Sequence, residues 1–309
     1  MIVTLTINPA IDRTVLVDRL AFDDRAYILS STEEAGGRGI NASRVIASFG
    51  GKTIAILTSG GQAGEKIQEL LSDEQFRSQV VRIGRESRLN LTISDKQGLT
   101  VKLNERGALV TADELNQLRD LVESSISHAS WLMLCGSLPP GVPPHFYCEL
   151  IAMARAKKVR TLLDTDGDAL LHALEEQPSV IKPNQQEAER LLNTALITRS
   201  QILEAAGRLR RMGPEALILS LGTRGAIAAT AEEMWEVLPP RTEALCPIGA
   251  GDALAAAFVW GMDRKKTFTD AVRWGVAAGT ASAALPGLSF ASFEQTKAVY
   301  KQVTVRQAS

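Results

Sequence analysis

Cysteine and histidine are scarce in this sequence of 309 residues, which holds three of each. Cys135, Cys148 and Cys246 are widely spaced and form no CxxC pair. A disulfide framework or a zinc site is therefore not expected, and the composition suits a reducing compartment. The three histidines have no matching partners, so we interpret them as structural or solvent-facing.

The chain also lacks an excess of charge and long apolar segments. Its formal net charge is −1, so no overall field attracts it to nucleic acid or to a membrane surface. The opening residues, MIVTLTINPAID, have no basic start and no long apolar run, and charged residues or proline interrupt the most apolar late stretches. We therefore predict a soluble, cytoplasmic protein that binds neither nucleic acid nor membranes.

What the sequence does contain is an alternation of short β-branched runs and helical patterns. Strands separated by helices indicate βαβ units and a mostly parallel sheet. We therefore predict a single α/β domain over residues 1–309, with Ala- and Gly-rich central helices after about position 250. The expected strands are 2–7, 53–57, 131–135, 160–164 and 216–220, and the expected helices lie near 39–49, 112–127, 145–157 and 200–212.

Two segments break this rhythm, residues 12–34 and 86–106. Both are extended and alternate polar with apolar residues, without a helical period. We expect them to pair as a small antiparallel flap, or lid, over the main sheet. Within the second segment Arg88 and Asn90 share a strand face and could grip a phosphate, although an exposed arginine on an edge strand more commonly serves solubility.

The motif GAGD at 249–252 puts a carboxylate at the start of an apolar helix. Glycines at 249 and 251 leave backbone N–H groups uncovered, and a helix N-terminus of this kind binds phosphate. Asp252 could then take the proton of an alcohol while the amides hold a transferring phosphoryl group. The alternative is an acidic residue that only complements the helix dipole.

A second glycine turn, EAGGRGINA at 34–42, resembles nucleotide-binding fingerprints without satisfying them. GRGINA fits G-x-G-x-x-A, but the required preceding strand and the acidic residue about 20 positions later are missing. GGKT at 50–53 follows a helix and lacks the first glycine of a P-loop. What remains is a glycine-lined backbone that a polar ligand such as a sugar can approach closely.

Three further loops are candidates for ligand binding. In KPNQQE, Asn184 and Glu187 are three residues apart and could hold a hydrated Mg²⁺, although a helix-capping pair explains the spacing better on its own. GSLPPGVP at 136–143 ends a strand in a rigid loop, where ligands bind open α/β sheets. SLGTRGA at 220–226 is a glycine turn that can face a flat base or form a simple hairpin.

Taken in order, NPAID, GGRGIN, GSLPPG, KPNQQE, SLGTRGA and GAGD resemble the PfkB, or ribokinase-like, sugar-kinase family across nearly the whole chain. The resemblance is greatest to the phosphosugar branch, the kinases of fructose 6-phosphate, fructose 1-phosphate and tagatose 6-phosphate. It implies a ribokinase-like, doubly wound sheet flanked by helices, with a β-sheet lid that often forms a homodimer contact. It also implies phosphoryl transfer from ATP, with Mg²⁺, to a ketohexose phosphate.

The same resemblance implies roles for individual residues. Asp252 would be the catalytic base, and Gly249, Ala250 and Gly251 would form the anion hole with its amide. The sugar and its phosphate would be held by Asp12, Arg25, Gly36, Gly37, Asn41, Arg88, Asn90 and Ser137. The nucleotide would be bound by Lys182, Asn184, Ser220, Gly222, Thr223, Gly225 and Gly279, with Asn184 and Glu187 organising Mg²⁺.

The chain departs from the family pattern at three places. Position 38 is Arg, where lysine or glycine is common, so the charge at the sugar loop differs. Pro247 follows Cys246 where a threonine is common, which leaves activation by a monovalent cation open. Tyr27 stands where a second basic residue can help to bind the sugar phosphate.

Two other functions stay open beside the phosphosugar kinase. One is a kinase of an unphosphorylated sugar or nucleoside, and the other is a non-catalytic regulator that binds nucleotide or sugar. Asp252 together with Asn184 and Glu187 favours an enzyme, because a pure binding protein needs no base. A dehydrogenase, suggested only by GRGINA, ranks last.

Overall fold

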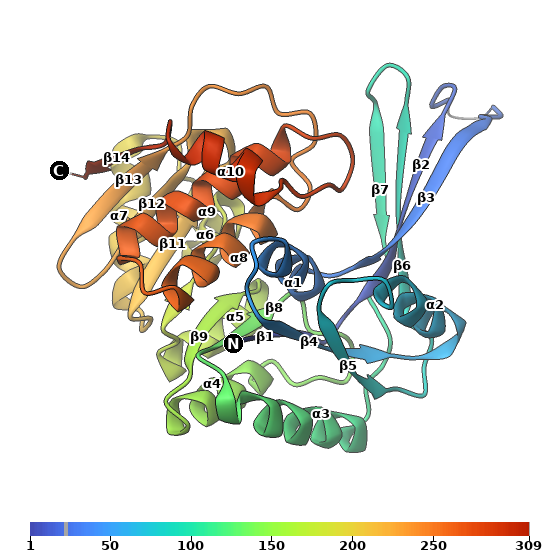
Figure 1. Ribbon diagram of the computed structural model, residues 1–309, viewed down its shortest axis with the longest axis horizontal. Coiled ribbons are helices and arrows are strands. Elements are labelled where there is room, and N and C mark those ends of the chain that lie inside the picture. Colours follow the sequence, from blue (N-terminus) through green and yellow to red (C-terminus); the bar gives the residue numbers. More distant parts are fainter. Residues whose placement is uncertain (22–23, 309) are drawn as a thin grey trace.

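A ten-stranded sheet forms the centre of the protein in the computed structural model, which describes residues 1–21 and 24–308 (Figure 1). Its strands are β1 (Ile2–Thr6), β4 (Thr53–Ser59), β5 (Arg77–Arg82), β8 (Trp131–Cys135), β9 (Arg160–Asp164), β10 (Val180–Ile181), β11 (Ala216–Ser220), β12 (Ala226–Ala229), β13 (Met234–Leu238) and β14 (Thr304–Gln307). The strand order is β14-β13-β12-β11-β10-β9-β8-β1-β4-β5. All neighbours from β11 to β5 run parallel, and those from β11 to β14 run antiparallel.

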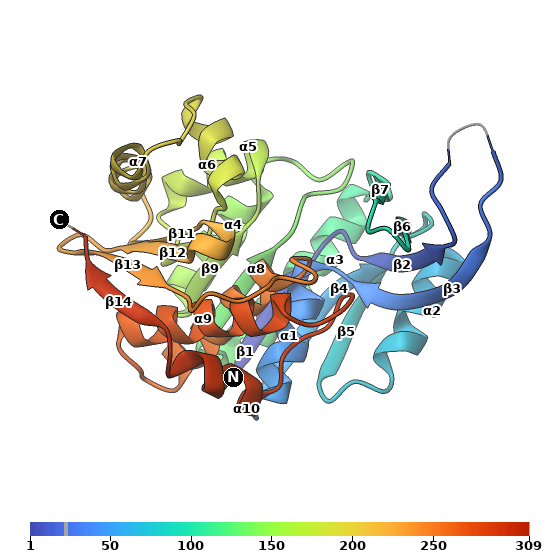
Figure 2. The same ribbon diagram turned by 90° about the horizontal axis from the view of Figure 1, so that it is seen from above.

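Helices cover both faces of this sheet (Figure 2). They are α1 (Arg38–Ser48), α2 (Gly61–Leu71), α3 (Ala112–Ser125), α4 (Phe146–Ala156), α5 (Gly167–Ala173), α6 (Gln185–Leu192), α7 (Arg199–Arg211), α8 (Ala250–Asp263), α9 (Phe268–Ala283) and α10 (Phe293–Tyr300). In one apolar core, the helices α3, α4, α5, α6 and α7 pack against one face of the sheet. In a second core, α1, α8 and α9 pack against the other face. The predicted mostly parallel, doubly wound sheet flanked by helices is confirmed.

The strands are apolar because they are covered on both sides. Every residue of β1 and β8 is buried, as is usual for parallel strands between two helix layers. Small residues bring α8 and α9 together on one of these faces. A Cβ added to Gly279 would lie 2.8 Å from the carbonyl oxygen of Ala250, so this contact fixes the first turn of α8 against α9.

A second, four-stranded sheet forms the lid. Its strands are β2 (Ala10–Val17), β3 (Ile28–Gly36), β6 (Arg88–Asp95) and β7 (Thr100–Asn104), in the order β3-β2-β6-β7. Two hairpins project side by side from the main body (Figure 1). Each hairpin is antiparallel, but β2 and β6 pair in parallel, so the expectation of an antiparallel flap is wrong for the central pair. Both strands run in the same direction because β2 continues from β1 and β6 follows β5, which are parallel members of the main sheet.

The strand and helix boundaries depart little from the sequence expectation where a pattern was clear. The expected helices at 39–49, 112–127, 145–157 and 200–212 match α1, α3, α4 and α7 to within two residues. The short α5, the glycine-led α2 and the C-terminal α10 and β14 were not predicted. Among the described residues, no helix is both long and apolar enough to span a membrane.

Candidate active site

The GAGD motif forms the start of α8. Gly249 is the N-cap with φ of +78°, and a Cβ there would come within 2.9 Å of Leu288 and 3.0 Å of Phe290, so glycine alone suits the position. Ala250 donates its amide to the Pro247 carbonyl at 3.3 Å. The amides of the next two residues donate to no backbone carbonyl in the described part of the chain, so the helix begins with N–H groups available to an anion.

Asp252 is held by a hydrogen bond from another helix. Nδ2 of Asn41, in the first turn of α1, donates to Oδ2 of Asp252 at 2.8 Å. Removal from bulk water raises the pKa of Asp252 to about 6, and the negative charge of Asp164 adds to the rise. The bond from Asn41 and the charges of Arg38 and Lys182 oppose it. A carboxyl with this pKa is mostly ionised near pH 7 and can accept a proton.

A cavity of about 600 Å³ opens beside the N-terminus of α8. Its size suits a small ligand, and part of its wall is the loop 239–244. The structure brings all the residues expected at the nucleotide together in its lining. These are Lys182, Asn184, Ser220, Gly222, Thr223, Gly225 and Gly279, and Glu187, Ala250, Gly251 and Asp252 line the same cavity.

Asn184 and Glu187 form the helix cap that the sequence offered as the alternative to a metal site. Oδ1 of Asn184 accepts from the amide of Glu187 at 2.9 Å, and Oε2 of Glu187 accepts from the amide of Asn184 at 2.8 Å. Both residues nevertheless line the cavity, since α6 begins at its edge. Capping fixes the directions of both side chains and leaves the second carboxylate oxygen of Glu187 for other partners.

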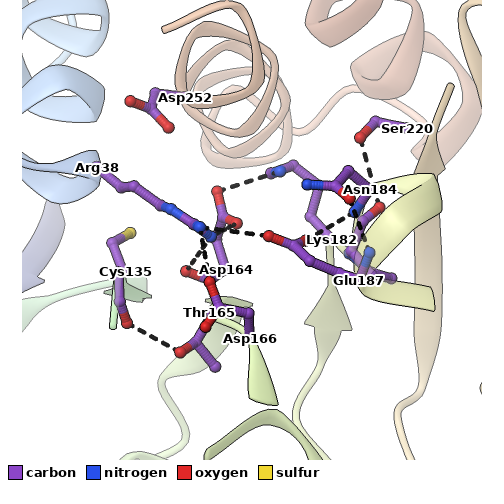
Figure 3. Close-up of polar contacts among 12 residues, drawn as sticks. Arg38, Cys135, Asp164, Thr165, Asp166, Lys182, Asn184, Glu187, Ser220 and Asp252 are labelled. Carbon is purple, nitrogen blue, oxygen red and sulfur yellow. Dashed lines mark hydrogen bonds and ion pairs between the residues drawn. The ribbon is translucent and has the colours of Figure 1, made fainter. Parts of the chain in front are cut away.

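Four charged side chains in the lining of the cavity form one group, which we call its floor: Arg38, Asp164, Lys182 and Glu187 (Figure 3). Nζ of Lys182 lies 3.2 Å from Oδ2 of Asp164, and both side chains are buried. Arg38 contacts Asp164, Asp166 and Glu187 at 2.9, 3.1 and 3.3 Å. Burial raises the pKa of Glu187, and Asp164 raises it further. Buried charges of both signs thus lie within one hydrogen-bonded group.

Apart from Arg25, the residues expected at the sugar lie where the lid joins the main body. Oδ1 of Asp12 accepts from Nδ2 of Asn90 at 2.8 Å, across the paired strands β2 and β6. Burial raises the pKa of Asp12, while Asn90 and Arg88 oppose the rise. Gly36 lies directly against it, since a Cβ there would be 2.0 Å from Oδ2 of Asp12.

Gly37 and Ser137 complete this sugar-side group. Gly37 caps α1 with φ of +136°, and a Cβ there would lie 2.5 Å from Cγ2 of Thr6. Ser137 accepts a hydrogen bond at 3.2 Å from Nδ2 of Asn8, in the turn between β1 and β2. The carboxyl edge of the main sheet therefore carries glycine-lined backbone next to hydroxyl and amide side chains.

Arg88 is anchored by the backbone rather than by an acid. Its two terminal nitrogens donate to the carbonyls of Asn8 and Glu105, both at 3.0 Å. Burial lowers the pKa of Arg88, and the charges of Asp12 and Glu105 oppose this. Among the described residues, Nε of Arg88 and Oδ1 of Asn90 are buried without a hydrogen-bond partner. A polar ligand that reached either atom would supply the missing hydrogen bond.

Arg25 does not lie beside Arg88 in the same chain. It lies in the segment that connects β2 to β3, beyond the pair Val17 and Ile28, whereas Arg88 pairs with Ala10 at the other end of β2. Seven steps of about 3.3 Å separate the two ends by roughly 23 Å. The expectation that both arginines grip one phosphate from the same lid is therefore not met within one chain.

Sequence reasoning missed several charged residues of the site. Asp164 is the last residue of β9, and Asp166 is the N-cap of α5. RTLLD was noted only as a strand, although an acid at the carboxyl end of a buried strand is a usual ligand position. Glu34 and Arg44 lie near Asp12. Burial raises the pKa of Glu34, the charge of Arg44 opposes this rise, and the charge of Asp12 adds to it. Nothing in their local sequence distinguishes these two from surface residues.

Comparisons with known proteins agree with this geometry. The model of the pfkB family of carbohydrate kinases matches residues 3–295. The ATP-dependent 6-phosphofructokinase isozyme 2 of Escherichia coli (strain K12) is 32% identical over 302 residues, which cover 97% of each chain. The 1-phosphofructokinase of Borreliella burgdorferi is 30% identical over 306 residues, 99% of this chain and 98% of that one. Escherichia coli phosphofructokinase-2, solved in complex with potassium, matches with a TM-score of 0.92 at 31% identity over 97% of this chain and 98% of that chain.

The chain therefore belongs to the pfkB family of carbohydrate kinases. The predicted family and its ribokinase-like fold with a lid are confirmed. The prediction of an enzyme is confirmed with them, since the family is one of kinases.

Proposed function

We propose that this protein transfers the γ-phosphoryl group of ATP to a ketohexose phosphate and so produces a bisphosphate and ADP. The candidate acceptors are fructose 6-phosphate, fructose 1-phosphate and tagatose 6-phosphate. Relatives named 6-phosphofructokinase and 1-phosphofructokinase support this substrate class. The observation that carries the proposal is that Asp252 bonds to the sugar-side residue Asn41 while lining the cavity for the nucleotide.

In the chemical step Asp252 is the base. Its carboxylate takes the proton of the acceptor hydroxyl as that oxygen forms a bond to the γ-phosphorus and the bond to the bridging oxygen of ADP breaks. The amides of Gly251 and Asp252 face the charge on the transferring group. The proton then rests on Asp252, whose raised pKa suits both acceptance and later release near neutral pH.

Mg²⁺ fits the cavity as a companion of the nucleotide phosphates rather than as an ion held by protein alone. Among the described residues, no cluster of three or more His, Cys, Asp or Glu side chains is arranged to hold a metal. The oxygens of Asn184 and Glu187 are of the type that Mg²⁺ prefers, but both cap α6, so contact through water suits them best. When bound, the ion would neutralise phosphate charge.

The phosphate already on the substrate would be bound by Arg88 at the base of the lid. The unpartnered Nε of Arg88 supports this role, because a phosphate oxygen could accept its hydrogen bond. Asp12 and Asn41 would bind sugar hydroxyls, together with the backbone at Gly36 and Gly37. This part of the proposal separates a phosphosugar from an unphosphorylated sugar, which would leave the buried Nε of Arg88 without a hydrogen-bond partner.

We further propose a homodimer formed through the lid. Exposed apolar side chains in and beside the lid strands support it, namely Tyr27, Ile28, Leu29, Leu99 and Leu103. Light scattering should then give twice the chain mass of 33.3 kDa for the wild type and a smaller mass for Ile28→Glu. Equal masses for both proteins would contradict the lid contact.

Activation by a monovalent cation is tested by replacing K⁺ with a bulky organic cation in the kinase assay described below.

The experiment that tests the function is a coupled ADP-release assay with ATP, Mg²⁺ and a panel of acceptors. The panel holds fructose 6-phosphate, fructose 1-phosphate, tagatose 6-phosphate, fructose, ribose and adenosine, with Asp252→Asn as the matched inactive control. Turnover confined to a phosphosugar is the expected result. Turnover of fructose, ribose or adenosine alone would replace it with a sugar or nucleoside kinase, and nucleotide binding without any turnover would favour a regulator.

A further inference from the structure

Arg38 occupies the centre of the charged floor of the cavity, although none of the roles above uses it. It is the first residue of α1, and its side chain lines the same cavity as Asp252. Figure 3 shows its guanidinium directed away from α1 into the group of acidic side chains below Asp252. A side chain that only capped a helix or improved solubility would be expected to point to solvent, not into the cavity.

The guanidinium joins three separate elements of the fold. Nη1 donates to Oδ1 of Asp164 at 2.9 Å and to its carbonyl at 3.3 Å, at the end of β9. Nη2 donates to Asp166, before α5, at 3.1 Å and to Glu187, in the first turn of α6, at 3.3 Å. Only a planar, multi-donor cation can make all of these contacts together, and the compact ammonium of lysine cannot.

Arg38 balances much of the negative charge that gathers at the cavity. Three carboxylates, on Asp164, Asp166 and Glu187, bond to Arg38, and the charge of Asp252 interacts with Arg38, Lys182 and Asp164. Lys182 is the second cation of the group, through its contact with Asp164. Without Arg38 the buried carboxylates of Asp164 and Glu187 would share a single lysine. An uncompensated buried charge is costly, and it would also repel the phosphates of an incoming nucleotide.

The same residue is mechanically linked to the base. Arg38 and Asn41 are three positions apart in α1, so their side chains leave the helix on the same face. Asn41 bonds to Asp252, while Arg38 bonds to the acidic group. The first turn of α1 is therefore fixed at two points, one on the base and one on the floor of the cavity.

We propose that Arg38 is a positioning residue for phosphoryl transfer. Its guanidinium fixes the first turn of α1 against Asp164 and Glu187 and, through Asn41, sets the orientation of Asp252. It also supplies the permanent positive charge on the floor where the nucleotide phosphates would lie. This inference rests on the proposed kinase function and adds to it a residue at which the chain departs from the more common lysine or glycine.

The test compares Arg38→Gln and Arg38→Lys with a control, Arg119→Gln, which loses a surface ion pair to Glu149 far from the cavity. For Arg38→Gln we expect kcat to fall about 10- to 100-fold, the effect of losing a charge-assisted hydrogen bond. The KM for the phosphosugar should change much less, whereas the KM for ATP should also rise, because the cavity loses a positive charge. Arg38→Lys should recover part of the rate, and Arg119→Gln should keep the wild-type rate.

Two readouts distinguish positioning from a general structural defect. Guanidine at concentrations too low to unfold the protein should restore part of the kcat of Arg38→Ala but none of that of Asp252→Asn. The acidic limb of the kcat profile should move to higher pH in Arg38→Gln and return in Arg38→Lys. Of the groups that face Asp252, only the arginine changes, since Asp164, Lys182 and Cys135 stay in place.

The outcomes separate this inference from the proposed function. A wild-type protein without turnover on any phosphosugar would overturn the proposed function and this inference with it. An active wild type together with an Arg38→Gln variant that keeps more than half of kcat would overturn the inference alone. If Arg38→Gln does not fold, Arg38→Lys and Asp166→Asn decide, because wild-type kcat in both would equally contradict a positioning role.

Discussion

Nδ2 of Asn41 lies 2.8 Å from Oδ2 of Asp252, and this hydrogen bond joins the first turn of α1 to the cavity at the N-terminus of α8. The two residues are 211 positions apart in the chain, on α1 and α8. Because α1 also carries the glycine turn at its start, the backbone proposed to receive the sugar and the amide that bonds to the proposed base belong to one helix. The proposed base is thus aligned by the element that carries part of the proposed sugar site.

Replacement of Asp252 by asparagine should separate catalysis from stability. We expect kcat of Asp252→Asn to fall by about 10²- to 10⁴-fold, the usual contribution of a positioned base, with little change in substrate affinity. A variant that retains more than half of its activity would remove Asp252 from the mechanism. Rates are measured at saturating ATP and phosphosugar, and binding is measured by calorimetry.

The same variant should be more stable than the wild type above neutral pH. Folding raises the pKa of Asp252 from 3.8 to about 6, so the ionised carboxylate opposes folding. This cost is absent below pH 3.8 and complete above about pH 6, where it reaches up to about 3 kcal/mol. Urea unfolding at pH 8 should therefore show the larger free energy of unfolding for Asp252→Asn, and the difference should vanish near pH 4. Equal stability at pH 8 would contradict the raised pKa.

Loss of Arg88 should affect the two substrates unequally. Because Arg88 lies at the base of the lid and does not line the nucleotide cavity, Arg88→Ala should raise KM for the phosphosugar about 10- to 100-fold, as for other charged hydrogen bonds. KM for ATP should stay close to the wild-type value. Arg77→Ala, an exposed arginine on β5, is the control. Equal increases in both KM values would argue against a phosphate contact.

The close approach of Gly36 to Asp12 predicts a specific defect on the sugar side. A Cβ in Gly36→Ala would lie 2.0 Å from Oδ2 of Asp12, so the carboxylate must move. We expect a loss of about 1–3 kcal/mol in stability, typical of overpacking, together with a higher KM for the sugar. Gly84→Ala is the matched control, because its Cβ would lie 3.7 Å from Glu114. Kinetics of Gly36→Ala like those of the control would show that Asp12 does not bind substrate.

The sequence predicted the main sheet well because parallel strands and their helices leave strong local patterns. The pairing of β2 with β6 was missed, since strand direction in the lid depends on where β1 and β5 end rather than on residues 12–34 or 86–106. The sequence also singled out Arg38 as a change of charge but did not predict its contacts, for a related reason. Its acidic partners lie 126 to 149 positions away, and no local spacing signals such a contact. The motifs identified the glycine turns and Asp252, but the charges around them depend on the assembled fold.

Glutamine at position 187 distinguishes the capping role of Glu187 from a role at the metal. A glutamine at the third helical position still accepts the bond from the amide of Asn184, so Glu187→Gln keeps the cap of α6 and removes only the charge. If Glu187 helps to organise Mg²⁺ around ATP, the variant should need a higher Mg²⁺ concentration for half-maximal rate and should regain activity when Mg²⁺ is raised. Its melting temperature should stay near that of the wild type. A lower rate that does not respond to Mg²⁺ would show that the charge acts through Arg38, and an unchanged rate at every Mg²⁺ concentration would leave Glu187 only its capping role.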